Sequence, residues 1–141
     1  MLNQSKYRVA IVSNQAGIGR SLMSETDLQD IHIRMRADAQ TAGGRIEQIY
    51  YCPHDWNDGC ECRKPKPGML FQAQRELNLD LSHTLFFGDD DRDGEAADNA
   101  GCIFVRVSEE RPLIKSVVEL LKTQTAEGLE HHAKANTDNR P

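Results

Sequence analysis

Apolar residues along the chain follow two patterns, short continuous runs and a longer stretch with helical spacing. The runs are rich in β-branched or aromatic residues, which is typical of buried strands, and they lie within the predicted strands 8–13, 46–51, 84–87 and 103–107. Helical spacing is clearest after Ser24, where apolar residues recur every three to four positions: Leu28, Ile31, Met35, Ala39 and Ala42. The pattern therefore predicts strands that are separated by helices.

Local signals mark the ends of the predicted helices. Ser24, followed by Asp27 three residues later, suggests a capping box at the start of the first helix. Pro67 suits the start of a second helix, and Gly101 suits the end of a third. A last amphipathic helix is expected over residues 113–121, and residues 14–20, which contain two glycines, are expected to form a loop.

Strands that alternate with helices indicate βαβ units. We therefore expect an α/β fold of the Rossmann-like type, in which helices cover both faces of a parallel sheet. Ligands bind at the carboxyl ends of the strands in such sheets, and Ser13, Cys52 and Asp89 lie at or just after those ends. Residues 1–122 are expected to form one domain, and residues 123–141, which lack apolar periodicity, a polar and disordered tail.

Charge and hydropathy narrow the classes of partner. The net charge of -5 argues against a general nucleic-acid-binding surface. No apolar run approaches the roughly 18 residues that span a bilayer, and the apolar stretch near the N-terminus is too short for a signal peptide. We therefore expect no membrane and no nucleic-acid partner, and a cytoplasmic location.

Three of the four cysteines lie close together with a histidine. The spacing is C-x-H-x5-C-x-C, formed by Cys52, His54, Cys60 and Cys62. Four nitrogen and sulfur ligands favour a closed, structural zinc site, and a reducing cytosol favours metal binding over disulfides. The alternative is a set of free thiols with a chance histidine. Cys102 lies apart and is expected to be a core thiol.

Two cations follow the last of these ligands directly. Arg63 and Lys64 precede Pro65 and Pro67, which stiffen the segment. A guanidinium group binds phosphate through bidentate hydrogen bonds, and an ammonium group binds it as a point charge. The alternative is an ordinary solvated basic patch.

Carboxylates crowd after the third predicted strand, in the segment from Asp89 to Asp93. Oxygen-rich sites of this kind suit Mg²⁺. The alternative is an acidic helix N-terminus that the helix dipole stabilises. A weaker signal follows the first strand, where Ser13 and the amides after it can donate hydrogen bonds to a phosphoryl group or simply form a turn.

Three segments together resemble the haloacid-dehalogenase (HAD) superfamily. They are "VSNQAGIGR", "YYCPHDWNDGCECRKPKPGML" and "FFGDDDRDGEAADNAG", and the similarity runs from about Tyr7 to Val107. The branch is the group of D-glycero-D-manno-heptose 1,7-bisphosphate phosphatases and histidinol-phosphatases. The resemblance implies a Mg²⁺-dependent phosphatase with a phosphorylated sugar or a similar small phosphomonoester as substrate.

The resemblance also implies a role for each matching residue. Ser13 and Lys64 would bind the transferring phosphoryl group, and Arg63 would help to recognise the substrate. Asp89 would bind Mg²⁺ with support from Asp93. The set expected near the substrate is Asn14, Gln15, Ala16 and Asp90, and the set expected to bind zinc in the loop 52–62 is Cys52, His54, Cys60 and Cys62.

Two features depart from the family pattern. Asp90 stands where heptose-bisphosphate phosphatases usually have lysine. The resemblance therefore does not carry over the substrate contact that the lysine makes in the family. The family also opens with a strand ending in D-x-D-G-T, which supplies the nucleophile and the general acid, and no D-x-D precedes Ser13 here. The resemblance places that strand at the centre of the sheet, so we expect the chain alone to have little activity and to self-associate or accept a partner strand.

Three functions remain open from the sequence. The first is a sugar-phosphate phosphatase of the heptose-bisphosphate type, with histidinol phosphate as the alternative substrate. The second is a non-catalytic, zinc-stabilised remnant that binds a phosphorylated ligand or a partner chain. The third is a plain zinc-binding module, which would leave Ser13, Lys64 and Asp89 unexplained.

Overall fold

The computed structural model describes Leu2, Ser5 and residues 7–123. The chain falls into two compact units, Met1–Arg106 and Val107–Pro141. In the second unit residues 113–123 are helical, which confirms the expected last helix and adds two residues to it. Thr123 belongs to this helix, and the rest of the expected tail, residues 124–141, lies outside the described residues.

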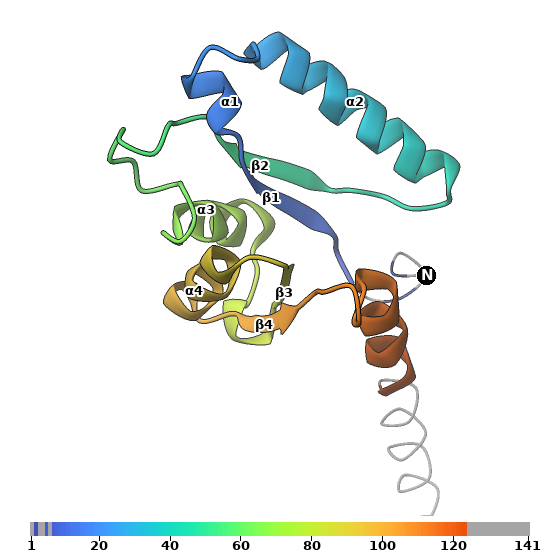
Figure 1. Cartoon of the computed structure of the whole chain (residues 1–141). Helices are drawn as coiled ribbons and strands as arrows, with labels where there is room; N and C mark the ends of the chain where they lie inside the picture. The colour runs from blue at the N-terminus through green and yellow to red at the C-terminus, as the bar shows by residue number, and fades with distance from the viewer. Residues whose placement is uncertain (1, 3–4, 6, 124–141) are drawn as a thin grey trace, which may run out of the picture. The chain divides into compact units, whose positions relative to one another are not determined.

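The first unit contains all the strands and the labelled helices of the described chain (Figure 1). The strands are β1 (Ala10–Asn14), β2 (Gln48–Cys52), β3 (Leu85–Gly88) and β4 (Ile103–Arg106). The helices are α1 (Ala16–Gly19), α2 (Glu25–Thr41), α3 (Gly68–Leu77), the 3₁₀ helix η2 (Leu81–His83) and α4 (Asp91–Ala100). None of the described helices has the length and apolar character needed to span a bilayer.

The strands form two parallel pairs. In the β1–β2 pair, Ser13 lies opposite Tyr51, and in the β3–β4 pair, Phe86 lies opposite Phe104. No ladder joins β1 to β3 in the described part of the chain. The expected α/β fold with parallel strands is confirmed, and its sheet is divided between β1 and β3.

Helices cover both faces of the β1–β2 pair. Successive side chains of a strand point to opposite faces, so neighbouring residues of β2 contact different helices. Tyr51 faces α2, where its ring lies 5.6 Å from that of His32. Tyr50 and Cys52 face the other way and pack with Met69 of α3. Figure 1 shows α2 and α3 on opposite sides of this pair.

A second cluster lies between the β3–β4 pair, α3 and α4. Its buried members are Leu70, Leu81, Ala96, Ala97, Ala100 and Cys102, so the prediction of a core thiol at Cys102 is confirmed. Val12 and Leu79 contact both this cluster and the one around Tyr50. These two residues therefore link the two strand pairs.

The predicted helix signals are confirmed at several ends. The Ser24 Oγ accepts from the Asp27 N–H at 3.1 Å, and the Asp27 carboxylate accepts from the Ser24 N–H at 3.0 Å, which completes a capping box. Gly101 ends α4 with a φ of 75°, a left-handed conformation that glycine adopts without strain.

Two local predictions are wrong. Residues 14–20 are not wholly a loop, because residues 16–19 form the short helix α1. The predicted apolar face of α2 is shifted, because Ile31 is 49% exposed whereas its neighbour His32 is buried. The buried face passes through Leu28 and His32, a spacing of one helical turn.

Among the residues that the structure describes, β1 and β3 each have one edge without a strand partner. The Gln15 N–H donates to the Cys52 carbonyl, so alternation turns the backbone groups of Val12 away from β2. The Ile103 N–H donates to the Thr84 carbonyl, which likewise turns those of Phe87 away from β4. No residue of β1 or β3 is fully buried.

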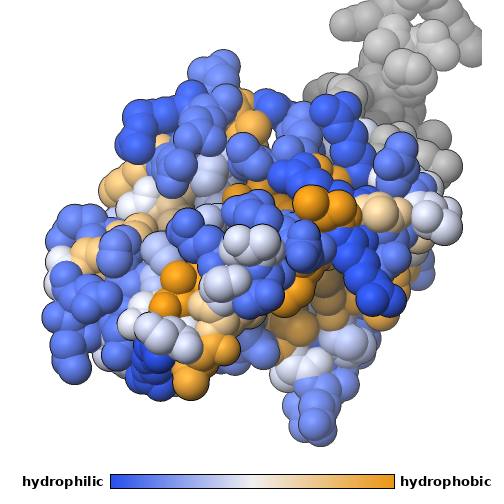
Figure 2. Space-filling model, turned by 90° about the horizontal axis from the view of Figure 1, so that it is seen from above, coloured by the Kyte–Doolittle hydropathy of each residue, from blue (hydrophilic) through white to orange (hydrophobic). Residues whose placement is uncertain are grey.

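Apolar side chains also reach the surface of the described chain. The large ones that are exposed are Leu22, Ile31, Ile33, Trp56, Phe71, Ile103, Leu113 and Ile114. Figure 2 shows orange apolar groups set among polar ones on the face seen from above. Single exposed apolar residues are normal on soluble proteins, so the distribution alone indicates no binding site.

Candidate functional site

The four predicted metal ligands converge. One ligand atom from each of Cys52, His54, Cys60 and Cys62 lies within 4.8 Å of the others. The Sγ of Cys62 is 3.1 Å from the Sγ of Cys52 and 3.2 Å from the Nδ1 of His54. Tetrahedral zinc with sulfur and nitrogen ligands needs separations of about 3.4–3.8 Å. The Sγ of Cys52 lies within this range of two donors, at 3.4 Å from the Nδ1 of His54 and 3.6 Å from the Sγ of Cys60. The Sγ of Cys62 lies slightly closer to its neighbours than the range, so the donor set fits a four-coordinate zinc ion after a small outward shift of Cys62.

Burial and hydrogen bonds shift the pKa values of the three thiols in this cluster. Burial, and then hydrogen bonds with Cys52 and Cys60, raise the pKa of Cys62 to about 12. Burial also raises the pKa of Cys52. At Cys60 burial also acts to raise the pKa, but hydrogen bonds, first from the Arg63 backbone, outweigh it and lower the pKa. A metal ion binds the thiolate form, so its charge would offset the cost of ionising Cys52 and Cys62. A divalent ion would supply that charge and close the loop.

Backbone contacts hold the ligand loop against its neighbours. The Gly19 N–H at the end of α1 donates to the Pro53 carbonyl at 2.8 Å. Gly68, the first residue of α3, lies so close to the loop that a Cβ there would be 2.3 Å from the carbonyl oxygen of Glu61. Glycine at 68 thus allows the loop to pack directly on the start of the helix.

Asn14 docks the basic segment onto the end of β1. Its side-chain amide donates to the Lys64 carbonyl at 3.1 Å and accepts from the Lys64 N–H at 3.0 Å. Both polar groups of the amide are therefore used on the backbone of Lys64. This arrangement fixes where the Lys64 side chain starts.

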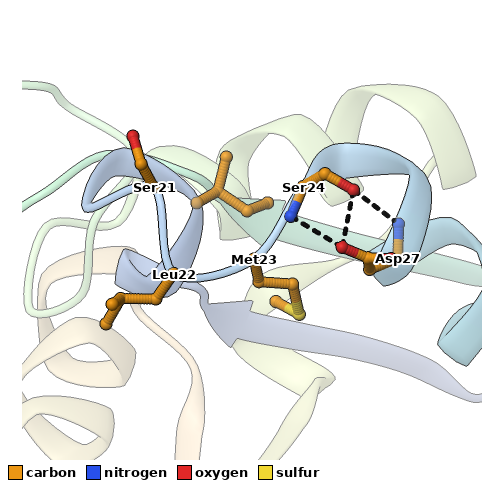
Figure 3. Close-up of a pocket in the computed structure, with 6 residues that line it drawn as sticks. Ser21, Leu22, Met23, Ser24 and Asp27 are labelled. Carbon is orange, nitrogen blue, oxygen red and sulfur yellow. Dashed lines mark hydrogen bonds between the residues drawn. The ribbon is translucent and has the colours of Figure 1, made fainter.

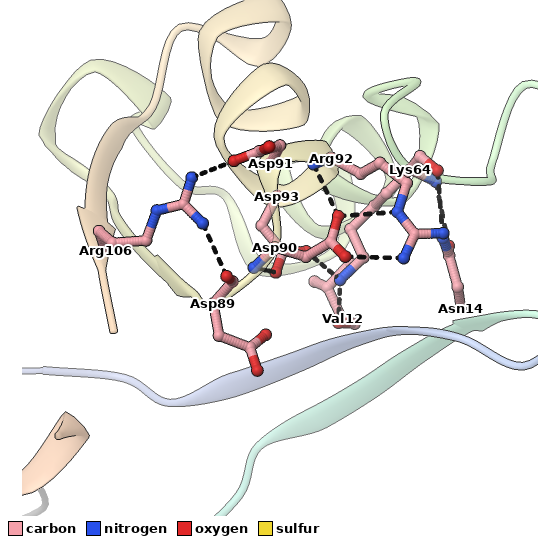
Figure 4. A network of polar contacts seen from close by, with 9 residues as sticks. All are labelled: Val12, Asn14, Lys64, Asp89, Asp90, Asp91, Arg92, Asp93 and Arg106. Atoms are coloured by element: carbon pink, nitrogen blue, oxygen red, sulfur yellow. Dashed lines mark hydrogen bonds and ion pairs between the residues drawn. The ribbon is translucent and has the colours of Figure 1, made fainter. Parts of the chain in front are cut away.

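The Lys64 side chain then crosses to α4. Its Nζ donates to the Val12 carbonyl at 3.2 Å and to the Asp93 Oδ1 at 2.5 Å (Figure 4). Both side chains of this ion pair are largely buried, with 13% and 8% of their surface exposed. Gly88 leaves room for the carboxylate, since a Cβ at 88 would lie 2.4 Å from the Cβ of Asp93.

The start of α4 carries a second capping box. The Asp90 carboxylate accepts from the Arg92 N–H at 2.9 Å, and that of Asp93 accepts from the Asp90 N–H at 3.3 Å. The guanidinium group of Arg92 also binds both oxygens of Asp90, at 2.7 and 2.8 Å, and lowers the pKa of Asp90 well below its usual range. The acidic helix start considered from the sequence is thus present in this segment.

Cations occupy three of the four carboxylates between residues 89 and 93. Asp90 binds Arg92, Asp93 binds Lys64, and Asp91 binds Arg106. Asp89 differs, because Arg106 binds its backbone carbonyl at 2.6 Å and its exposed carboxylate has no partner in the described chain (Figure 4). Mg²⁺ sites often use one or two carboxylates together with waters and substrate phosphate. Asp89 alone fits the protein's share of such a site.

The remaining predicted residues lie at the end of β1 and at the end of the ligand loop. The Ser13 Oγ accepts from the Gln15 amide at 2.9 Å. Ala16 begins α1. The Arg63 Nη1 donates to the His54 carbonyl at 3.2 Å. Within the described residues, Arg63 forms no ion pair, so its charge is available to an anion.

Sequence reasoning missed Trp56 and Arg92. The Trp56 ring lies within cation–π distance of both Arg63 and Arg92. Trp56 is the sole tryptophan, and Arg92 is a cation inside an acidic run. These two features could have drawn attention to the residues. The contact between Trp56 and Arg92, however, joins residues 36 positions apart and depends on the tertiary fold.

An open hollow lies where α1 leads into α2 (Figure 3). Its volume is about 480 Å³, and it is lined by Ile18, Ser21, Leu22, Met23, Ser24 and Asp27. None of these is a predicted site residue, and two of them form the capping box described above. The polar lining residues Ser24 and Asp27 are thus accounted for by helix capping.

Comparisons with known proteins identify the family. A family model described as HAD-hydrolase-like matches residues 61–118. D-glycero-beta-D-manno-heptose-1,7-bisphosphate 7-phosphatase of Pseudomonas aeruginosa is 44% identical over 101 residues, which cover 72% of this chain and 57% of the relative. The protein of that name from Pseudomonas putida is 39% identical over 121 residues, 84% of this chain and 69% of the relative. The chain belongs to the HAD-like heptose-bisphosphate phosphatases.

Solved structures agree with this family. D,D-heptose 1.7-bisphosphate phosphatase from B. bronchiseptica, complexed with magnesium and phosphate, matches with a TM-score of 0.73 at 39% identity. That match covers 75% of this chain and 59% of the other. A HAD-like phosphatase from Mesorhizobium loti matches with a TM-score of 0.63 at 28% identity. The chain thus spans little more than half the length of most of these relatives, and the resemblance seen in the sequence is confirmed.

Proposed function

We propose that this chain provides the phosphate-binding part of a Mg²⁺-dependent phosphatase that acts on a sugar phosphate. The proposed substrate is D-glycero-D-manno-heptose 1,7-bisphosphate, cleaved at its 7-phosphate. The observation that carries the proposal is Lys64, whose ammonium group is held between the carboxyl end of β1 and the start of α4. The names of the relatives favour this sugar over histidinol phosphate.

Each proposed role follows from the position of a side chain. Lys64 and the hydroxyl of Ser13 stabilise the phosphoryl group, and Arg63 attracts the rest of the charged substrate. Asn14 and Gln15 orient Lys64 and Ser13, through the hydrogen bonds described above. Contacts of Ala16 and Asp90 with the substrate remain part of the proposal.

The two metals have different proposed tasks. Asp89 holds Mg²⁺, which neutralises phosphate charge when bound. Cys52, His54, Cys60 and Cys62 hold zinc as a structural ion, since four protein ligands leave no open position for catalysis. The zinc loop thereby fixes the backbone that presents Arg63 and Lys64. A cytoplasmic location, where thiols stay reduced, is part of this proposal.

The unpaired edges of β1 and β3 are the proposed place of a further parallel strand. In the resemblance, a strand ending in D-x-D supplies the nucleophile, and a strand between these edges would end beside Lys64. Pairing would give a strand partner to backbone groups such as the N–H of Val12, whose carbonyl already accepts from Lys64. Without such a strand, a second copy of the chain is the proposed partner at these edges.

A non-catalytic role is the second candidate. It is favoured by the ion pairs at the site, because Asp90, Asp91 and Asp93 are each bound to a cation and the remaining carboxylate, Asp89, is the proposed Mg²⁺ ligand, which leaves no carboxylate assigned as nucleophile. In that case the chain would bind a phosphorylated ligand without hydrolysing it. Phosphate binding is common to both candidates, and turnover separates them.

Calorimetric titration with inorganic phosphate in the presence of Mg²⁺ tests the proposed site. Asp89→Asn should abolish the Mg²⁺-dependent part of the binding, because it removes the charge that attracts the ion. Asp98→Asn, at an exposed position of α4, is the matched control and should bind as the wild type does. A phosphate affinity that changes neither on addition of Mg²⁺ nor in Asp89→Asn would contradict the proposed site.

A further inference from the structure

The tip of the ligand loop carries the one tryptophan of the chain. Trp56 lies between the ligands His54 and Cys60, and its side chain is half exposed. The Cζ of Arg63 is 4.5 Å from its ring centroid, and the Cζ of Arg92 is 5.1 Å from it. One ring thus contacts guanidinium groups from two separate segments, the end of the ligand loop and the start of α4.

Hydrogen bonds at the loop tip fix the backbone of Trp56. Its N–H donates to the Asp55 Oδ1 at 2.7 Å, and the Asp55 N–H donates to the Asp58 Oδ2 at 2.7 Å. Arg20 binds the same Asp55 oxygen at 2.8 Å, which ties the tip to the end of α1. The ligands on either side of the tip set its ends, so a bound metal ion would set the position of the ring.

The two guanidinium groups, called here the guanidinium pair, are held differently. Arg92 has a fixed orientation because Asp90 binds it at two points. Arg63 has no carboxylate partner within the described residues and is held by the His54 carbonyl and the Trp56 ring. Two cations repel each other, and the negative face of an aromatic ring offsets part of that repulsion.

We propose that Trp56 is a positioning residue that keeps the guanidinium pair together for a phosphorylated ligand, and that metal in the ligand loop is required for this. Lys64 follows Arg63 directly and is paired with Asp93, the residue after Arg92. The three cations therefore come from two neighbouring segments, and carboxylates bind two of them, Arg92 and Lys64, which leaves Arg63 as the cation without a carboxylate partner in the described chain. The inference rests on the proposed function for the nature of the ligand, whereas the contact itself is testable without it.

Phosphate affinity measures the proposed effect. Cation–π contacts at exposed sites correspond to about two- to fivefold each, so loss of both contacts in Trp56→Leu should weaken phosphate binding about five- to thirtyfold. Trp56→Phe keeps an aromatic face and should stay within about threefold of wild type. Phe71→Leu is the matched control, since Phe71 is a partly exposed ring with no cation contact in the described chain.

The indole N–H signal of the sole tryptophan gives a readout that does not depend on phosphate. In a nitrogen–proton correlation spectrum this signal should move when zinc is removed by a chelator and when Arg92 is replaced by Met. A signal that ignores Arg92→Met, or a Trp56→Leu variant that binds phosphate as tightly as wild type, would overturn the inference. If wild type binds no phosphate, the proposed function fails, and the indole signal still decides the role of Trp56.

Discussion

Replacing Lys64 by Met should destabilise the chain strongly. The Nζ of Lys64 lies 2.5 Å from the carboxylate of Asp93, and both side chains are largely buried. Without the cation, the carboxylate stays buried with only a weak N–H donor, and a buried charge that loses its partner costs about 3–5 kcal/mol. The lost hydrogen bond to Val12 adds about 1 kcal/mol, so the total is a large part of the roughly 5–15 kcal/mol that stabilises a domain.

The same substitution at Lys66 is the matched control. Lys66 pairs with Glu61 at 2.7 Å, but the two side chains are 44% and 85% exposed, so water and salt screen the interaction. Lys66→Met should leave the unfolding midpoint unchanged within error. Lys64→Arg, which keeps a cation beside Asp93, should lie between the two.

Urea unfolding followed by circular dichroism, at constant zinc, measures these differences. The double variant Lys64→Met with Asp93→Asn should be less destabilised than the sum of the single variants, with a coupling energy of about 1–3 kcal/mol. The reasoning would be refuted if Lys64→Met behaved like Lys66→Met. Strict additivity in the double variant would refute it equally, because the pair would then not be coupled.

Three further predictions concern other parts of the chain. Purified protein should contain about one zinc ion per chain, and Cys60→Ser should lower this content in metal analysis; zinc-free wild type prepared without chelators would contradict the ligand assignment. The unpaired edges of β1 and β3 should make the chain oligomeric, aggregation-prone or marginally stable, and a sharp thermal melt from a monomer in light scattering would show otherwise. Burial lowers the pKa of His32, so the unfolded state binds a proton at this residue more readily than the folded state does, and stability should fall as the pH drops below about 6.5. His32→Leu should reduce this dependence of the melting temperature on pH. An unchanged dependence would exclude His32 as its source.

Features with local causes were predictable from the sequence. The capping box at Ser24 and Asp27 depends on residues three positions apart, and the end of α4 depends on the free backbone of Gly101. The candidate metal ligands were recognisable because their spacing confines them to a short segment, which brings Cys52 and Cys62 together largely independently of the rest of the fold.

Features set by tertiary contacts were not predictable. Ile31 and His32 are neighbours on α2, and periodicity favoured the more hydrophobic one, but packing against Tyr51 buries the histidine instead. The sequence also showed carboxylates at residues 89–93 without showing which of them cations neutralise. Only the fold brings Lys64 to Asp93, which leaves Asp89 as the carboxylate of this run without a cation partner in the described chain.

Phosphate release from D-glycero-D-manno-heptose 1,7-bisphosphate tests the central claim most directly. The chain is assayed with Mg²⁺, alone and fused at its N-terminus to a strand segment ending in D-x-D. The proposed function predicts little or no release by the chain alone, a clear rise in the fusion, and loss of that rise in Asp89→Asn. A folded, zinc-loaded fusion that releases no phosphate would contradict the claim, and so would robust turnover by the chain alone.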